Sequence, residues 1–165
     1  GVAGGDINGD GYDDLIAGAD GYDLGGSSAG AAFVFFGSTT GMSGSYAAAT
    51  DADMTVLGAT SSDYLGEGVA SADVNNDGID DLLVGADGND DAASSAGIAY
   101  LFHGAADIGG TYYGTEADAS MTGGSSSGYG GQIMYVVDGD NDGVVEVWMS
   151  EYGTERVNVF IGGGL

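Results

Sequence analysis

The fold is decided by one stretch near the start of the chain, DINGDGYDDLIAGA at residues 6–19. Its frame is Asp-x-Asn-x-Asp-Gly-x-x-Asp, with oxygen-bearing side chains at alternate positions, then a glycine, then a closing carboxylate. The frame recurs at residues 73–81, and a more acidic third copy occupies residues 138–146, where the closing acid is Glu146. Side chains at this spacing can surround one hard cation with the six to eight oxygens that Ca2+ requires.

The three loops concentrate the negative charge of the chain, because four acidic residues lie in each loop and 26 in the whole sequence. Two carboxylates about 4 Å apart repel by roughly 4 kcal/mol at a surface-like effective dielectric. Loops without a cation would therefore store repulsion comparable with the stability of a small domain. The alternative is that each loop is an acidic turn exposed to solvent and without a cation. This alternative is strongest for the third copy, whose closing acid is Glu and not Asp.

The loops differ from an EF-hand, which needs a bidentate Glu at its twelfth position. That position holds Ala17, Val84 and Met149 in the three copies. Short apolar runs at residues 15–17 and 82–84 follow the first two loops, and such runs predict strands rather than helices. Each loop is therefore expected to connect two strands of a hairpin.

A whole structural unit repeats, since the first copy maps onto the second at a constant offset of 67 residues, from Asp6 to Asp73. The same offset maps residues 18–20 onto 85–87, 27–30 onto 94–97 and 33–37 onto 100–104. With 35 Gly, no Pro and no Cys, the chain favours many tight turns between strands. We treat residues 1–165 as a single repeat region with units of about 1–65, 66–129 and 130–165.

Each unit is expected to hold four strands. The second unit places them near residues 68–73, 81–85, 97–102 and 121–122, and the fourth strand of the first unit near residues 54–57. The third unit supplies three, near residues 132–137, 145–149 and 156–161. A repeated four-stranded antiparallel sheet of this length is typical of a β-propeller blade, so the fold class is all-β with about two and three-quarter blades.

The calcium-type frame followed by Leu, a hydrophobic residue and Gly-Ala resembles the FG-GAP repeat of integrin α-subunit propellers and their bacterial relatives. An aromatic or Leu residue followed by Gly precedes the acidic loop in the second and third copies, at Leu65-Gly66 and Tyr129-Gly130. The resemblance implies about three Ca2+ sites, each made of four side chains and one backbone carbonyl. Their side-chain ligands are Asp6, Asn8, Asp10 and Asp14; Asp73, Asn75, Asp77 and Asp81; and Asp138, Asp140, Asp142 and Glu146. The carbonyl ligands belong to Tyr12, Ile79 and Val144.

The sequence departs from that family in three ways. The family has Pro after Gly-Ala, whereas this chain has Asp20 and Asp87, and the third copy replaces the tripeptide with residues 149–151, Met-Ser-Glu. Family propellers close with about seven blades, whereas this chain has fewer than three and cannot close alone. We therefore expect it to belong to a longer array or a repeating assembly, with the edges at residues 1–5 and 156–161 covered by other copies or adjacent repeats.

The net charge of −25 with one basic residue, Arg156, excludes nucleic acid and anionic membranes as partners. No apolar run approaches the roughly 18 residues needed to span a bilayer. Weak modular calcium sites fill where Ca2+ is millimolar, which favours an extracellular or cell-surface location.

The sequence argues against an enzyme, because it has one His, no Cys and no Lys. His103 lies at a strand end where the first unit has Phe36, which favours a structural role. Two non-enzymatic hypotheses remain. The chain is a structural module of a filament or surface matrix, or it is a fragment of an adhesion propeller that binds a protein or glycan. The second hypothesis names Tyr22, Tyr46, Tyr112 and Tyr113 as candidate contacts, with exposed turn tyrosines as the alternative.

Overall fold

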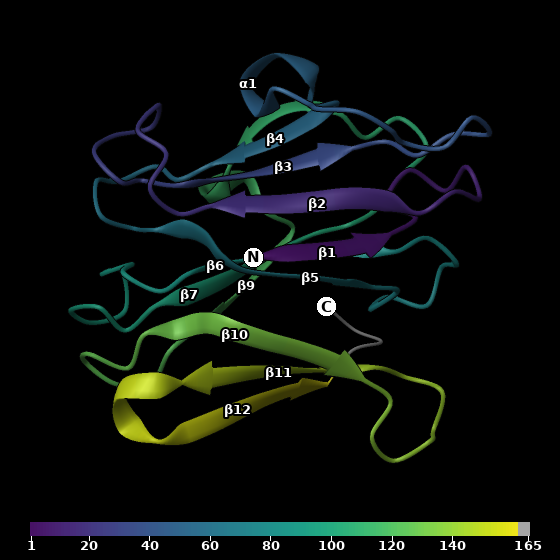
Figure 1. The fold of residues 1–165 in the computed structure, drawn as a ribbon. Coiled ribbons are helices and arrows are strands. Elements are labelled where there is room, and N and C mark those ends of the chain that lie inside the picture. The colour runs from purple at the N-terminus through teal and green to yellow at the C-terminus, as the bar shows by residue number, and fades with distance from the viewer. Residues whose placement is uncertain (162–165) are drawn as a thin grey trace.

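The computed structural model describes residues 1–161, which form three β-sheets stacked face to face (Figure 1). The first sheet contains β1 (Val2–Gly5), β2 (Asp14–Ala19), β3 (Ala31–Phe35), β4 (Met54–Leu57) and β8 (Gly110–Tyr113). The second contains β5 (Leu65–Ala72), β6 (Asp81–Ala86), β7 (Ile98–Phe102) and β9 (Ala119–Thr122). The third contains β10 (Gly130–Val137), β11 (Glu146–Glu151) and β12 (Arg156–Ile161).

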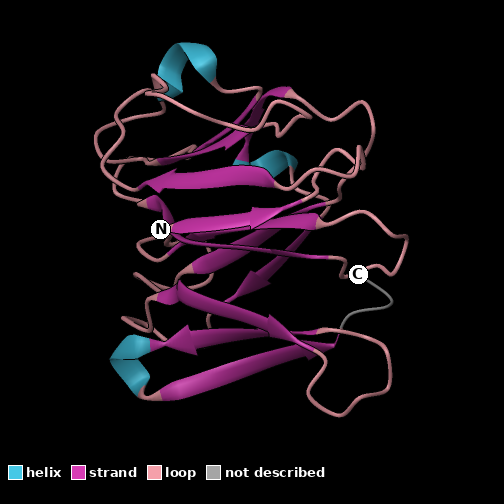
Figure 2. Cartoon of the chain, turned by 45° about the vertical axis from the view of Figure 1, so that its right-hand side comes forward, coloured by secondary structure: helices cyan, strands magenta, loops and turns pink. Residues whose placement is uncertain are grey.

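The predicted all-β class is confirmed, and so are the tandem antiparallel blades. Within each sheet, strands that follow one another in the chain pair antiparallel. These are β1 to β4 in the first sheet, β5, β6, β7 and β9 in the second, and β10 to β12 in the third. The sheets form an open stack and not a closed ring (Figure 2). In the part of the chain that the structure describes, helical structure is limited to short pieces, namely α1 (Ala48–Asp51), η1 (Gly114–Glu116) and η2 (Tyr152–Thr154). None of the helices within residues 1–161 is long and apolar enough to cross a membrane.

Strand β8 is the main element that the sequence did not predict. It belongs by position to the connection between β7 and β9, yet it pairs in parallel with β4 of the first sheet, with Met54 opposite Gly110 and Leu57 opposite Tyr113. The connection between the third and fourth strands of the second unit therefore contains a strand that covers the outer edge of the first blade and ties it to the second. Tyr112 packs its ring against Phe102 at a centroid distance of 5.8 Å and is half-buried.

Two hydrophobic cores fill the spaces between the sheets. Between the first and second sheets, Ile16 and Val34 pack against residues such as Leu82 and Tyr100. Between the second and third sheets, Leu83 and Leu101 lie with residues such as Val147 and Met149. Adjacent residues such as Leu82 and Leu83 thus serve different cores, because successive strand side chains point to opposite faces. Both faces of β7 are buried, which explains its continuous apolar sequence.

The glycine of each Gly-Ala pair lets neighbouring sheets approach closely. A Cβ added to Gly18 would overlap the carbonyl oxygen of Gly66, and one added to Gly85 would overlap that of Gly131. Gly66 and Gly131 have φ values of +95° and +91°, a region that glycine adopts without strain. The repeated glycines therefore set the close packing of successive blades.

Candidate metal centre

The three acidic loops lie at the same end of the three sheets, where they join β1 to β2, β5 to β6 and β10 to β11 (Figure 1). Each loop follows the first strand of its sheet and returns into the second. The strands therefore fix both ends of every loop.

The first loop is folded by its own carboxylates. The Asp6 carboxylate accepts hydrogen bonds from the backbone N–H groups of Asp10, at 2.9 Å, and Gly11, at 2.8 Å. The Asn8 side-chain oxygen also accepts from the Asp10 N–H, and Asp10 accepts from the Tyr12 N–H, both at 3.0 Å. These turns hold the side-chain oxygens of alternate residues on the inside of the loop.

The second loop repeats this geometry at the 67-residue offset. The Asp73 carboxylate accepts from the N–H groups of Asp77, at 3.0 Å, and Gly78, at 2.8 Å. The Ile79 N–H donates to Asp77 at 2.9 Å, as the Tyr12 N–H does to Asp10. The sequence repeat is therefore a repeat of loop conformation as well.

The closing carboxylates of the first two loops are buried and tie each loop to a third strand. Asp14 accepts from the N–H groups of Ile7, at 2.9 Å, and Gly37, at 2.8 Å. Asp81 accepts from those of Val74 and Gly104, both at 2.9 Å. Burial raises the pKa of both carboxyl groups above the ordinary value, while these N–H donors act in the opposite direction.

His103 lies beside the second loop. Its Nδ1 is 2.8 Å from the Asn75 side-chain nitrogen and 3.4 Å from an Asp81 oxygen. The imidazole therefore contacts two of the predicted metal ligands. The sequence did not predict this contact, because the equivalent residue of the first unit, Phe36, has no polar side chain.

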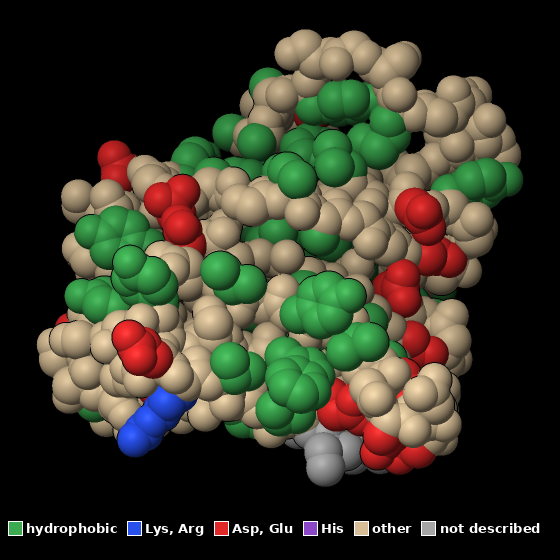
Figure 3. All heavy atoms as spheres, turned by 60° about the horizontal axis from the view of Figure 1, so that its bottom comes forward, with side chains coloured by type: hydrophobic (Ala, Val, Ile, Leu, Met, Phe, Trp, Pro, Cys, Tyr) green, Lys and Arg blue, Asp and Glu red, His purple; other side chains and the backbone are tan. Residues whose placement is uncertain are grey.

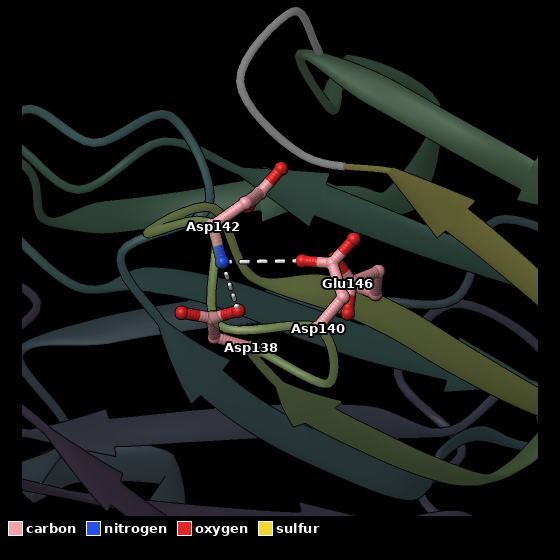
Figure 4. A group of neighbouring side chains, drawn as sticks. All are labelled: Asp138, Asp140, Asp142 and Glu146. Carbon is pink, nitrogen blue, oxygen red and sulfur yellow. Dashed lines mark hydrogen bonds between the residues drawn. The ribbon is translucent and has the colours of Figure 1, made fainter.

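The third loop brings four carboxylates together. One oxygen each from Asp138, Asp140, Asp142 and Glu146 lie within 4.8 Å of one another (Figure 4). The Asp142 N–H donates to Asp138 at 3.1 Å and to Asp140 at 3.2 Å, and the Gly139 N–H donates to Glu146 at 2.8 Å. Within residues 1–161, this is the one group of at least three acidic or histidine side chains with such close ligand atoms.

From the sequence, a solvated acidic turn without a cation was most plausible for the third loop. In the structure, that loop brings four carboxylates close together. In the first two loops an Asn replaces one acid, and the closing Asp directs both oxygens to backbone N–H groups. The longer Glu146 side chain stands with three Asp carboxylates instead. All twelve predicted side-chain ligands lie in the three loops, and the carbonyls of Tyr12, Ile79 and Val144 remain predicted ligands.

A comparison with protein-family models matches the FG-GAP repeat at residues 1–35 and 65–102. The chain contains FG-GAP repeats. The two matches run through the first three strands of the first and second sheets and include both Asn-containing loops. The third loop lies outside them. A search of curated proteins finds no match to the chain.

The strand register places Ser150 and Glu151 where the second unit has Gly85 and Ala86, so the Met-Ser-Glu alignment expected from the sequence was wrong by one residue. The third sheet thus departs from the FG-GAP pattern at Glu151, where the repeats have the Ala of Gly-Ala. Its buried carboxylate accepts hydrogen bonds from the Gly124 N–H at 2.7 Å, the Asn158 side chain at 2.6 Å and the Thr154 hydroxyl at 2.9 Å. The Gly124 N–H is the largest of the influences that lower the pKa of Glu151. This acid therefore fastens a loop of the preceding blade and does not belong to the metal loop.

A pocket opens at the opposite end of the FG-GAP sheets from the acidic loops. Its volume is about 410 Å3, and its lining includes the aromatic side chains of Tyr64 and Tyr129 and the acidic side chains of Asp63, Asp90 and Asp91. Asp63 is buried and accepts from the Thr60 N–H at 3.0 Å. Burial is the main reason that its pKa is raised. None of these residues is among the candidate ligand contacts that the sequence indicates.

Proposed function

We propose that the chain is a non-enzymatic, calcium-binding FG-GAP module with a structural role in an extracellular filament or surface matrix. The observation that carries this proposal is the third loop, where four carboxylates stand within 4.8 Å of one another. Oxygen donors at this density suit a hard divalent cation. The two loops with matching FG-GAP sequence and matching turns extend the assignment to three sites.

The donor sets fit Ca2+ in chemical type, since each loop offers carboxylate or amide oxygens and no sulfur. We assign the side chains of Asp6, Asn8, Asp10 and Asp14 to the first ion, with the Tyr12 carbonyl. Asp73, Asn75, Asp77, Asp81 and the Ile79 carbonyl take the second, and Asp138, Asp140, Asp142, Glu146 and the Val144 carbonyl take the third. The bound cation would supply positive charge that offsets the repulsion within each loop.

Weak extracellular calcium modules have Kd values of about 10⁻⁴ to 10⁻³ M, which suits an environment with millimolar Ca2+. The net charge of −25 is consistent with a module that depends on divalent cations. An extracellular or cell-surface setting is therefore part of the proposal.

The non-enzymatic assignment rests on the side chains available for chemistry. His103 is the single histidine, and it contacts Asn75 and Asp81, which we assign to calcium. The sequence holds no cysteine or lysine nucleophile.

Isothermal titration of the EDTA-treated, dialysed chain with CaCl2 tests the proposal. We expect three ions per chain, and two for Asp142→Asn, which removes one charge from the third loop. Asp20→Asn is the matched control, because Asp20 is an exposed acid outside the loops, and it retains three. Absence of calcium uptake at millimolar concentration in the wild-type chain would overturn the assignment.

The pocket supports a second candidate, a fragment of an adhesion propeller that binds a protein or glycan. Two tyrosine side chains beside acidic and hydroxyl groups provide an aromatic surface with hydrogen-bonding partners. Tyr64→Ser and Tyr129→Ser would then abolish retention of the chain on an array of neutral oligosaccharides while calcium stoichiometry stays at three. Equal retention of wild-type and variant chains would exclude the pocket as the contact.

A further inference from the structure

The second acidic loop has a neighbour that the first loop lacks, the imidazole of His103. The four side-chain ligands of the two loops are the same residue types in the same order, since they repeat at the offset of 67 residues. The same offset relates His103 to Phe36, whose side chain has no polar atom. Figure 3 shows acidic side chains crowded along one side of the molecule, which is the side of the loops. The two loops therefore differ in what surrounds their side-chain ligands and not in the ligands themselves.

The backbone holds His103 and Phe36 in the same way. The His103 N–H donates to the Asp118 carboxylate, and the Phe36 N–H donates to that of Asp53, both at 2.8 Å. In each unit the N–H of the glycine that follows donates to the closing carboxylate of the loop. The end of the third strand is thus fixed alike beside both loops, and the side chain it presents is the difference.

The amide of Asn75 is held at both of its ends. Its oxygen accepts from the Asp77 N–H, and its nitrogen donates to the Asp77 carboxylate, both at 2.9 Å. The same nitrogen lies 2.8 Å from Nδ1 of His103. Because an amide nitrogen only donates, Nδ1 accepts this hydrogen bond, and the imidazole carries its proton on Nε2. Both N–H bonds of the Asn75 amide therefore have a partner.

The corresponding amide of the first loop is held less firmly. The Asn8 nitrogen donates to Asp10 at 3.3 Å, and Phe36 offers it no acceptor. The Asn8 oxygen accepts from the Asp10 N–H at 3.0 Å, so the two amides point the same way. Asp10 and Asp77 are themselves assigned to the cation, which competes with the amides for their carboxylates. In the second loop, His103 is a partner that the cation does not require.

We propose that His103 is a positioning residue of the second calcium site, where it holds the Asn75 amide oxygen inside the loop and makes this site bind Ca2+ more tightly than the first. An amide that can turn presents its N–H groups to the cation part of the time. Fixing the amide in advance removes this unfavourable orientation and lowers the entropy cost of binding. Partners that orient a ligand without touching the metal change affinity by about 10–100-fold. The inference deepens the proposed calcium function and rests on it.

Backbone amide signals of the full chain report the two sites separately. The N–H groups of Gly11 and Gly78 donate to the first carboxylate of their own loops, both at 2.8 Å. Their signals in proton–nitrogen correlation spectra should therefore move as each loop takes up calcium. In the EDTA-treated, dialysed wild-type chain, the Gly78 signal should reach its midpoint at about tenfold lower CaCl2 than the Gly11 signal.

His103→Phe supplies the residue that the first unit has at this position. The Gly78 midpoint of this variant should rise about tenfold, into the range of the Gly11 midpoint, which should not change. Gly11 is thus an internal control in the same sample. Equal circular dichroism and equal melting temperatures in EDTA establish that the variant is folded. Coincident Gly11 and Gly78 midpoints in the wild type, or an unchanged Gly78 midpoint in the variant, would overturn the proposal.

The imidazole provides a readout that a purely structural role would not predict. His103 is the single histidine of the chain, so its ring nitrogens can be observed without overlap. At neutral pH we expect a bare Nδ1 and a proton on Nε2, with signals that shift as the second site fills. This shift should need at least about tenfold more CaCl2 in Asp77→Asn. It should need the same CaCl2 in Asp10→Asn, the matched change in the first loop. A proton on Nδ1, or ring signals that do not respond to calcium, would contradict the positioning role.

Failure of this inference is distinguishable from failure of the calcium assignment. A chain that takes up no calcium refutes the calcium assignment itself. A chain that takes up three ions, with equal affinity in the first two loops, refutes the role of His103 alone.

Discussion

At the scale of single residues, each loop carboxylate has a specific task that its position dictates. Asp73 accepts two backbone N–H groups and shapes the turn, while Asp81 connects the loop to the end of β7. Asp77 is exposed, and it accepts from the Ile79 N–H with one carboxylate oxygen and from the Asn75 side-chain amide with the other, both at 2.9 Å. The sequence predicted which side chains share a loop, because spacing alone determines that.

Replacing Asp77 with Asn tests whether the Asp77 carboxylate is a metal ligand. Asn keeps an oxygen that can accept from the Ile79 N–H but removes one charge from the loop. Changes in the outer shell of a metal site already cost about 10–100-fold in affinity, so we expect at least that loss at one of three sites. Calorimetry would detect it, and the same three affinities in wild type and Asp77→Asn would remove Asp77 from the ligand set.

Glu151→Gln probes a buried acid outside the metal loops. The lowered pKa means that the folded state favours the ionised form. This stabilisation is present above the unfolded pKa of about 4.3 and is lost as the pH falls through the lowered folded value. We expect Glu151→Gln to unfold more easily by about 1–2 kcal/mol at pH 7. The difference should vanish below the folded pKa, and a pH-independent difference in chemical denaturation would contradict the assigned charge effect.

At the scale of elements, the sequence pattern predicted the strands that have apolar sequences. It did not predict β8, whose sequence is polar. Strands β6 and β7 were placed within one or two residues, since their buried faces produce an apolar run. Strand β8 has the polar and glycine-containing sequence Gly-Thr-Tyr-Tyr, and its partner β4 lies more than fifty positions earlier. A parallel pairing at such separation has no local signal. The covering of the first sheet by Met42 and Tyr22 was also not predicted, and Tyr22, a candidate ligand contact in the sequence, instead packs against Phe33.

Two adjacent tyrosines test the role of β8. Tyr112 packs against Phe102, whereas Tyr113 is exposed. Tyr112→Ala should lower the free energy of unfolding by about 1–3 kcal/mol, because it removes a partly buried ring. Tyr113→Ala should change it by less than about 0.5 kcal/mol. Equal effects in urea denaturation would mean that β8 does not pack as described.

The contact between blades can be tested at its glycines. Gly85→Ala places a methyl group against the Gly131 carbonyl and should destabilise the chain by about 1–3 kcal/mol or more. Gly21→Ala is the control, since a Cβ there meets nothing within 4 Å. Thermal unfolding of the two variants should differ clearly. A Gly85→Ala variant as stable as Gly21→Ala would contradict the close packing of the second and third sheets.

At the scale of the whole molecule, the chain is an open stack with one covered end and one apolar end, and its three acidic loops share one side. The sequence predicted about two and three-quarter blades because the repeat offset counts them. It did not predict which sheet face stays exposed, since that depends on how residues 36–53 fold over the first sheet. It also placed most doubt on the loop with the closest carboxylates, because the loop frame does not reveal where the closing acid points.

We propose that calcium bound in these loops stabilises the fold. Binding to the native state alone contributes about 2.7 kcal/mol per site at a hundredfold excess over Kd. Three sites would therefore contribute a large part of the 5–15 kcal/mol typical of a folded domain.

Thermal unfolding of the chain in excess CaCl2 and in excess EDTA, followed by circular dichroism at neutral pH, tests whether calcium stabilises the fold. The melting temperature should fall sharply in EDTA and recover when CaCl2 is restored, whereas MgCl2 at the same ionic strength should restore it less. Superimposable melting curves in CaCl2 and EDTA would contradict the calcium assignment.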